Sequence, residues 1–369
     1  MLDAVILDFE TRSLCDLKAR GTDNYAQDTS TDILCMAAYS ILSKESWLWY
    51  PSDGALPASL LAEIGKVAFI VAHNARFDQL IWECVGVSDY GFPPQPIDKW
   101  YCSAAQCRVN AVPGGLADAS LFVTGRSLKM GEGMSLIKLL SIPNEHGVFN
   151  EDAAALKRMG DYCLQDVRAT HAVLEATRIM TAEEHNDWLV SERVNDMGIR
   201  VDVELARICA DQASAEADEM AVLLTELSGG RIEKVTQVQR IKKWFMYGLS
   251  AKAVEDYMTR TTTDDEGNPV VKASFDKAVR RKMLDAILAG DLSVPPEALE
   301  VLEIVEEGNK ASVSKFKKML TLADDGDQRV RGAYMYAGAR QTKRFSAKGL
   351  QVHNFKRDCF KPAEAEEAK

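Results

Sequence analysis

The first 185 residues alternate short apolar runs with longer stretches of helical periodicity, and this alternation constrains the fold more than any other feature. Apolar runs of strand length lie at residues 4–7, 34–42 and 67–72, and helical patterns lie at residues 77–85, 135–140 and 151–181. Strands interleaved with helices bury a central sheet beneath those helices. The pattern therefore predicts that residues 1–185 form an α/β domain, with a mixed central sheet flanked by helices.

The chain changes character after about residue 185. Helical patterns cover residues 184–227, with a break at 196–202 where Gly198 indicates a turn, and they resume at 236–247, 274–289 and 296–322. A polar, hairpin-like stretch at 261–269 interrupts them. We therefore expect a mainly α-helical domain over residues 186–330, followed by a separate segment, 331–369, that mixes glycine, aromatic and basic residues.

Charge is distributed unevenly along the 369 residues. The whole chain has a net charge of −11, but residues 310–361 contain 13 Lys/Arg and 4 Asp/Glu, a net charge of +9, whereas residues 1–309 carry a net charge of −18. An acidic body joined to a basic C-terminal segment suits a protein that holds metal ions in one part and contacts phosphates in another. The alternative is that the basic run is a solvated surface.

The sequence shows no sign of export or membrane insertion. Met1-Leu2-Asp3 opens the chain without a basic flank and apolar core, and apolar stretches such as residues 67–72 are too short to span a bilayer. Eight cysteines are scattered without a CxxC pair, which favours reduced thiols over a zinc site or a disulfide framework. We expect a cytoplasmic protein with no membrane partner.

Two acidic residues, Asp8 and Glu10, follow the first apolar run. Side chains on a strand alternate between faces, so these two carboxylates point the same way. Neighbouring carboxylates repel each other beside a buried strand, and a divalent cation relieves that repulsion. The alternative is a polar strand end with solvated acids.

Two further pairs of residues follow at wide spacing. Asn74 and Asp78 come after the third apolar run, where Asp78 can face the same sheet edge and the Asn74 side chain can fix the loop by hydrogen bonds. The alternative is that either residue caps a helix. Tyr162 and Asp166 lie four residues apart within a helical pattern and so share one helical face, although such pairs are also common without function.

The order of these motifs, DxE, then NxxFD, then YxxxD, resembles the three motifs of the DEDDy exonuclease superfamily. The resemblance implies a ribonuclease H-like fold and two divalent ions, Mg²⁺ or Mn²⁺, about 4 Å apart. It implies that Asp8 bridges both ions, that Glu10 and Asp166 complete the first site, and that Asp78 supports the second. Tyr162 would orient the attacking water, because a phenol with a pKa near 10 is a poor base at neutral pH.

The rest of the chain is similar to family A DNA polymerases. Residues 192–202 (ERVNDMGIRVD) look like the segment after the exonuclease, 310–315 (KASVSK) like the thumb helix, and 338–346 (GARQTKRFS) with 350–355 (LQVHNF) like the TGRxS…LQN stretch at the start of the palm. Lys343 replaces the usual Gly, and Phe355 the usual Ile or Leu. Basic and amide side chains suit phosphate and minor-groove contacts. The residues expected to bind DNA are Asn74, Lys310, Ser312, Lys315, Arg340, Thr342, Arg344, Gln351 and Asn354.

Together these resemblances predict a proofreading 3′→5′ exonuclease that acts on single-stranded 3′ ends and primer–template DNA and releases nucleoside monophosphates. The palm carboxylates and the fingers helix have no counterpart before Lys369, so we expect no polymerase activity from this chain alone. Either a second polypeptide supplies them or the sequence is a shortened polymerase, and a phage origin fits both. The alternatives are a stand-alone nuclease that trims RNA 3′ ends and a non-catalytic DNA-binding subunit.

Overall fold

The computed structural model describes residues 2–264, 266–308 and 314–355. Within these ranges the chain forms two compact units: the first runs up to Val201 and resumes at Thr321, and the second covers Asp202–Leu320. The units therefore divide at 201/202 and 320/321, whereas the sequence placed domain boundaries at 185/186 and 330/331. The chain enters and leaves the second unit within the course of the first.

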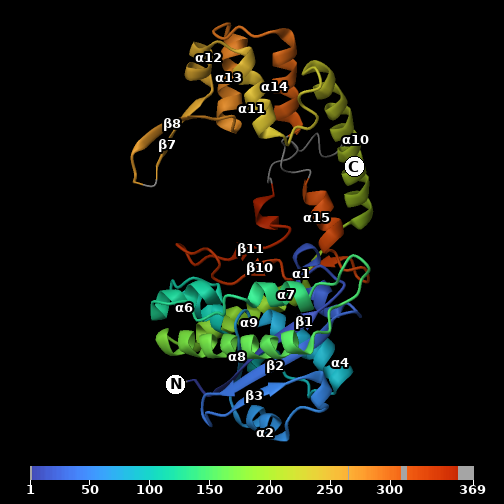
Figure 1. The fold of residues 1–369 in the computed structure, drawn as a ribbon, viewed down its shortest axis with the longest axis vertical. Coiled ribbons are helices and arrows are strands. Elements are labelled where there is room, and N and C mark those ends of the chain that lie inside the picture. Colours follow the sequence, from blue (N-terminus) through green and yellow to red (C-terminus); the bar gives the residue numbers. More distant parts are fainter. Residues whose placement is uncertain (1, 265, 309–313, 356–369) are drawn as a thin grey trace. The chain divides into compact units, whose positions relative to one another are not determined.

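The first unit is built on a five-stranded sheet in the order β3-β2-β1-β4-β5. Its strands are β1 (Ala4–Arg12), β2 (Asp32–Ser40), β3 (Ser46–Trp49), β4 (Phe69–Ala72) and β5 (Trp100–Cys102). β1, β2 and β3 pair antiparallel, whereas β4 pairs parallel with β1 and β5 parallel with β4. This mixed sheet, with helices on its faces, confirms the predicted α/β domain and fits the expected ribonuclease H-like fold (Figure 1).

Nine α-helices belong to the described part of the first unit, besides one shared with the second. They are α1 (Leu17–Gln27), α2 (Ala58–Lys66), α3 (Arg76–Ile81), α4 (Val87–Tyr90), α5 (Ser103–Val109), α6 (Leu116–Thr124), α7 (Gly133–Leu140), α8 (Ala153–Ala176) and α9 (Ala182–Met197). The long helix α8 packs against β1 and β2. Side chains fix both long helices at their starts: Asp152 caps α8, and Thr181 with Glu184 forms a capping box on α9.

The predicted helix at residues 77–85 is more irregular than expected. Helix α3 ends after Ile81, a π-helical turn covers Trp82–Gly86, and α4 then continues to Tyr90. The Trp82 side chain is fully buried, and its ring contacts Phe92 with centroids 4.9 Å apart. Packing of this large ring against the sheet core accompanies the irregular turn, which periodicity alone did not indicate.

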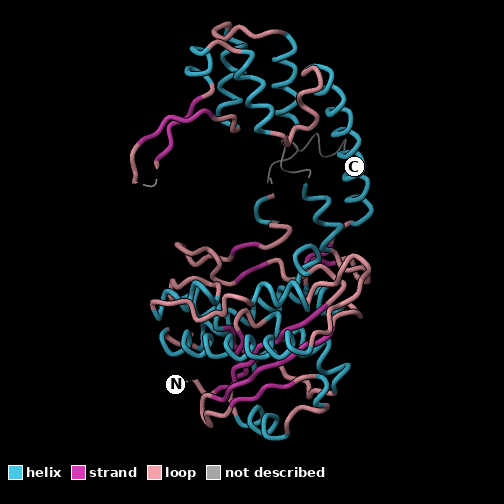
Figure 2. The backbone as a smooth tube through the Cα atoms, in the orientation of Figure 1, coloured by secondary structure: helices cyan, strands magenta, loops and turns pink. Residues whose placement is uncertain are grey.

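The second unit has a hydrophobic core of its own, built from helices. It contains α10 (Val203–Leu227), α11 (Val238–Gly248), α12 (Ala251–Tyr257), α13 (Lys277–Ala289), α14 (Pro296–Gly308) and most of α15 (Ser314–Leu322). Fully buried side chains at its centre include Leu224, Phe245, Met283 and Leu302. Strands β7 (Thr259–Thr263) and β8 (Pro269–Ala273) form the predicted hairpin, the two magenta strands beside cyan helices in Figure 2. The helical character is as predicted, whereas its role as a DNA-gripping thumb stays a prediction.

The segment after Thr321 returns to the first unit through short strands. β9 (Arg329–Val330) pairs with β6 (Ile199–Arg200), and β10 (Tyr334–Met335) pairs with β11 (Ser346–Ala347). A 3₁₀ turn follows at Val352–Asn354. Among residues 2–264, 266–308 and 314–355, no helix has the length and apolar character needed to cross a membrane.

Candidate metal centre and active site

Strand β1 presents Asp8 and Glu10 on one face, as the alternation of side chains predicts. The strand lies at the centre of the sheet, and its residues from Ala4 to Leu7 are buried. Asp8 stands opposite Ala37 and Glu10 opposite Cys35, so small neighbours on β2 leave room beside both carboxylates. The register between β1 and β2 shifts by an irregularity between Glu10 and Thr11, and pairing then continues to Arg12.

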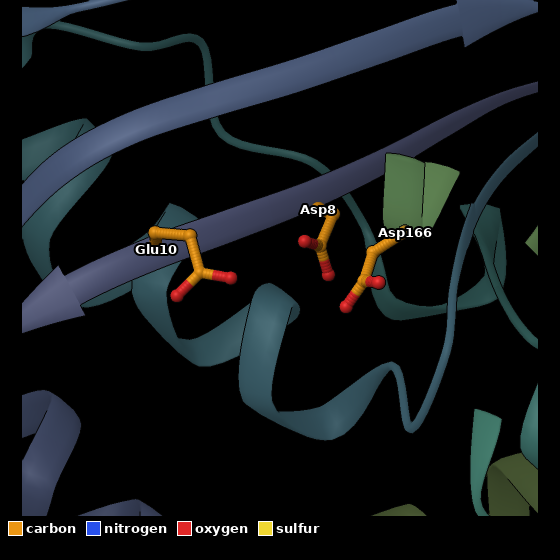
Figure 3. A group of neighbouring side chains, drawn as sticks. All are labelled: Asp8, Glu10 and Asp166. Carbon is orange, nitrogen blue, oxygen red and sulfur yellow. The ribbon is translucent and has the colours of Figure 1, made fainter. Parts of the chain in front are cut away.

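Asp166 on α8 completes a cluster of three acids. One carboxylate oxygen from each of Asp8, Glu10 and Asp166 lies within 4.8 Å of the other two. Figure 3 shows the three side chains pointing into the same space, two from the strand and one from the helix. The Oδ1 atom of Asp166 is buried without a hydrogen-bond partner. A buried, unpaired carboxylate oxygen is unfavourable unless a cation binds it.

Asp78 lies behind this cluster and does not belong to it. It stands in the first turn of α3, is 2% exposed, and its Oδ1 accepts a hydrogen bond of 3.2 Å from the backbone N–H of Phe9, the residue between Asp8 and Glu10. The structure therefore brings Asp78 to the same strand as predicted. Neither Asp78 nor Asn74 caps α3, because Ala75 occupies the N-cap position and makes no side-chain cap.

The predicted role of the Asn74 side chain in fixing its loop is wrong. Asn74 is exposed, and no side-chain hydrogen bond of this residue exists among the described residues. Its backbone makes the turn instead, with a φ of 69° and a carbonyl that accepts a hydrogen bond of 3.1 Å from the N–H of Phe77. Asparagine tolerates this left-handed conformation better than most residues.

Tyr162 lies one turn before Asp166 on α8, on the same face, as its spacing predicts. The side chain is 5% exposed. A Cβ atom at Gly133, the first residue of α7, would overlap the Tyr162 ring, so a glycine is required where α7 approaches the phenol. Burial raises the pKa of the Tyr162 phenol, and the phenol therefore stays protonated at neutral pH.

Sequence reasoning missed a cation in this pocket, Lys129. It belongs to the loop between α6 and α7, and its Nζ lies 2.6 Å from Asp166 Oδ2 and 5.1 Å from the centroid of the Tyr162 ring. It also missed Cys163, whose thiol donates hydrogen bonds to the carbonyl oxygen of Asp8 at 3.2 Å and to Asp8 Oδ2 at 3.5 Å. Neither residue belongs to a recognisable sequence pattern: Lys129 is a single lysine in a loop, and Cys163 is a single cysteine next to Tyr162. Their roles in the pocket therefore could not be predicted from the sequence.

Burial raises the pKa values of all four acids, and repulsion by neighbouring carboxylates adds to the shift in Asp8, Glu10 and Asp78. Burial, with the charge of Asp166 second, raises the pKa of Asp8 to about 7. Burial and then Asp8 raise the pKa values of Glu10 and Asp78 well above their usual range. Burial also raises the pKa of Asp166, although Lys129 opposes that shift. Ionisation of these buried acids therefore has a free-energy cost that a bound positive ion would offset.

The donor set fits a hard divalent cation. Carboxylate oxygens are the ligands that Mg²⁺ and Mn²⁺ prefer, and the unpaired Asp166 Oδ1 supplies a free ligand position. An open hollow of about 610 Å³ includes Arg12, two residues after Glu10 on β1, in its lining. Its lining residues are Arg12, Leu14, Ser30, Asp32, Val148, Phe149 and Glu151. The Arg12 guanidinium lies 5.3 Å from the centroid of the Phe149 ring.

The residues predicted to bind DNA lie apart from the acid cluster in the sequence and fall into three groups. Lys310 and Ser312 lie outside the described residues. Lys315 lies in α15 and is half-buried. Arg340, Thr342, Arg344 and Asn354 are exposed, and Gln351 is half-buried, in the segment after β10. Two hydrogen bonds tie this segment to α5 and its end, from Lys343 Nζ to the Val109 carbonyl and from Arg108 Nε to the Tyr336 carbonyl.

The first unit thus combines a mixed α/β sheet with an acidic cluster formed by its central strand and α8. Comparison with known proteins points to a particular relative. Over 366 residues the chain is 25% identical to a DNA polymerase of Bacillus phage SP02, and the match covers 94% of this chain. The chain spans about half the length of that relative, 50%. The predicted resemblance to a phage DNA polymerase is confirmed by this match.

Two solved structures match the chain at low sequence identity. The POL domain of Pol1 from M. smegmatis, in complex with DNA primer-template and dNTP, has 13% identity and a TM-score of 0.49, covering 96% of this chain and 52% of that chain. NrnC of Brucella melitensis with bound Mg²⁺ has 15% identity and a TM-score of 0.27, covering 47% of this chain and 73% of that chain. No protein-family model matches the chain.

Proposed function

We propose that this chain is a metal-dependent 3′→5′ exonuclease that edits DNA as part of a DNA polymerase. The observation that carries the proposal is the group of three carboxylates from β1 and α8, with ligand oxygens within 4.8 Å of one another and one buried oxygen unpaired. The relation to a phage DNA polymerase supports DNA as the substrate.

Each residue of the pocket has a role that its position supports. Asp8 lies between Glu10 and Asp166 and would contact both ions, Glu10 and Asp166 would complete the first site, and Asp78 would support the second, partly through water. When bound, the two ions activate a water and stabilise negative charge on the phosphate. Tyr162 keeps its proton, so its hydroxyl can hold the attacking water by a hydrogen bond.

The hollow lined by Arg12 and Phe149 would offer room for the terminal nucleotide. Leu14, Val148 and Phe149 present apolar surface to a base, while Arg12 presents a cation to a phosphate. The exposed basic residues of segment 338–355 would contact the backbone of primer–template DNA.

The test is degradation of a 5′-labelled single-stranded DNA in Mg²⁺ by the wild type and by Asp8→Ala and Asp166→Ala. We expect both variants to lose at least about a thousandfold in rate, because a missing ligand removes metal-assisted charge stabilisation. Asp161→Ala removes an exposed acid from the same helix and serves as the matched control. Wild-type activity in Asp8→Ala would overturn the proposal.

Two further outcomes separate the alternatives. A matched RNA oligonucleotide cleaved faster than the DNA would indicate an RNA-trimming nuclease instead. A wild-type protein that binds DNA but neither cleaves it nor binds Mn²⁺ at the acid cluster would indicate a non-catalytic subunit.

A further inference from the structure

A lysine lies within the pocket that should receive the metal ions. The Lys129 ammonium is 2.6 Å from Asp166 Oδ2, and the lysine side chain is 28% exposed, while that of Asp166 is 6% exposed. The ammonium also lies beside the Tyr162 ring, at 5.1 Å from its centroid. Its two neighbours are thus a proposed metal ligand and the proposed water-orienting residue.

The backbone holds Lys129 in this position. The carbonyl of Leu128 accepts a hydrogen bond of 2.7 Å from Nε2 of Gln165, the residue before Asp166, and the Leu128 N–H donates one of 3.1 Å to Ser120 Oγ. Beyond the loop, Gly133 lies directly against the Tyr162 ring. The loop is therefore attached to the same turn of α8 that carries Tyr162 and Asp166, and the ion pair follows from that attachment.

An ammonium and a divalent ion compete for the same carboxylate. An ammonium at hydrogen-bond distance and Mg²⁺ or Mn²⁺ at about 2.1 Å from one carboxylate repel each other strongly at such short range. Lys129 therefore stabilises Asp166 when no metal is bound and opposes metal binding. Once a metal has displaced it, the ammonium needs another anion, and a phosphate of the bound nucleic acid is the anion that this site would receive.

We propose that Lys129 is a built-in counter-cation that couples metal binding to phosphate binding, an inference that rests on the proposed metal-dependent function. A divalent ion displaces its ammonium from Asp166, and a substrate phosphate then pairs with the displaced ammonium. By thermodynamic reciprocity, phosphate raises metal affinity and metal raises phosphate affinity. The pocket thus fills with metal most readily when a 3′ end is present.

The test measures Mn²⁺ binding by electron paramagnetic resonance, with and without thymidine 5′-monophosphate, in the wild type, Lys129→Met and Lys129→Arg. We expect Lys129→Met to bind Mn²⁺ about tenfold more tightly than the wild type without nucleotide, because the competing charge is gone. We expect the nucleotide to tighten Mn²⁺ binding several-fold in the wild type and in Lys129→Arg, and much less in Lys129→Met. Lys138→Met, which removes an exposed lysine from α7, should match the wild type.

A second measurement guards against a purely structural role. In EDTA, Lys129→Met should melt at a lower temperature than the wild type, because Asp166 loses its partner, and Mn²⁺ should stabilise it more than it stabilises the wild type. A structural role alone would lower both melting temperatures equally. If Lys129→Met does not fold, Lys129→Gln, which keeps a hydrogen-bond donor, takes its place with the same expectations.

The outcomes distinguish this inference from the proposed function. Equal or weaker Mn²⁺ binding in Lys129→Met, or the same nucleotide effect in all variants, overturns the role of Lys129 while leaving the nuclease intact. Absence of Mn²⁺ binding in the wild type, or binding that Asp8→Ala leaves unchanged, overturns the proposed metal site and the role of Lys129 with it.

Discussion

Asp8 and Glu10 project from the same face of a buried strand. Burial raises the pKa values of both, and the charges of Asp166 and Asp8, respectively, add to the shifts. The spacing of two along a strand was enough to predict this pair, and the spacing of four along a helix was enough for Tyr162 and Asp166. Lys129 could not be predicted, because it reaches Asp166 from a loop 37 residues earlier through three-dimensional packing alone. The acids of the site were thus visible in the sequence, but their counter-charge was not.

The raised pKa of Asp8 makes the metal-free protein sensitive to pH. The pKa is about 7 in the folded chain and 3.8 when unperturbed, so between these values the folded state holds a proton that the unfolded state releases. The free energy of unfolding in EDTA should therefore fall as pH rises from about 4 to about 7. Asp8→Asn should remove much of this dependence and raise the melting temperature at pH 8 by about 2–5 °C.

Thermal denaturation at pH 5 and pH 8 in EDTA measures this effect, with Asp161→Asn as the control for an exposed acid. Mg²⁺ should restore the stability of the wild type at pH 8 and do less for Asp8→Asn, which has lost a ligand. A wild type that becomes more stable between pH 5 and pH 8 in EDTA, together with an Asp8→Asn variant that behaves identically, would contradict the assigned burial of charge.

Helices and strands differ in how well local sequence indicates them. Apolar runs predicted β1, β2 and β4, because these strands are buried on both faces. The polar turn at residues 261–269 predicted the β7–β8 hairpin. β5 has three residues, Trp100–Cys102, which is too short for any periodicity, and its place is set by pairing with β4. α1 contains Gly21 in a left-handed conformation with a φ of 81°, which breaks its helical pattern. Elements of this kind depend on tertiary contacts that no local pattern records.

Replacing glycine with alanine should change the free energy of unfolding in opposite directions in α8, which packs on the sheet, and in α2. A Cβ at Gly160 of α8 would overlap Tyr50 and lie 2.9 Å from Leu48 Cδ2, whereas a Cβ at Gly65 of α2 would meet nothing within 4 Å. Gly160→Ala should lower the free energy of unfolding by about 1–3 kcal/mol through overpacking. Gly65→Ala should raise it by up to about 1 kcal/mol through helix propensity. Urea denaturation measures both, and stabilisation by Gly160→Ala would mean that α8 does not pack closely on β3.

If the basic segment after β10 binds DNA, the affinity for DNA should depend on salt concentration through its arginines. Arg340 and Arg344 are exposed, and if they contact phosphates, replacing both with alanine should weaken primer–template binding and reduce the slope of log affinity against log salt by about 2. Fluorescence anisotropy of a labelled duplex across a series of KCl concentrations gives the slope. Replacement of Lys157 and Arg158, two exposed cations on α8, is the control for net charge. An unchanged slope in the Arg340/Arg344 variant would assign DNA binding elsewhere.

The whole molecule consists of two units with separate hydrophobic cores. The first core contains the sheet and α8, and the second is formed by α10, α11, α13 and α14. The candidate metal centre belongs wholly to the first unit, since Asp8, Glu10, Asp78 and Asp166 all precede Val201. The two units therefore need not respond alike to a bound metal.

Calorimetry should show this independence as two unfolding transitions in EDTA. Mg²⁺ should raise the midpoint of one transition by several degrees and leave the other within about 1 °C, because a ligand stabilises only the unit that binds it. Asp166→Ala should abolish the shift. A single transition that moves as a whole with Mg²⁺ would show that the two cores unfold together.

The short pairing of β6 with β9 has an evolutionary consequence. Val201, the last residue before the helical unit, donates a hydrogen bond of 2.9 Å to the Gln328 carbonyl, and Ala323, just after that unit, bridges to Val330 in β9. The chain thus departs from and rejoins the first unit at one small patch of sheet. A gene segment for residues 202–320 could be lengthened, shortened or exchanged by recombination at two neighbouring junctions, while the acids of the candidate metal centre keep their geometry.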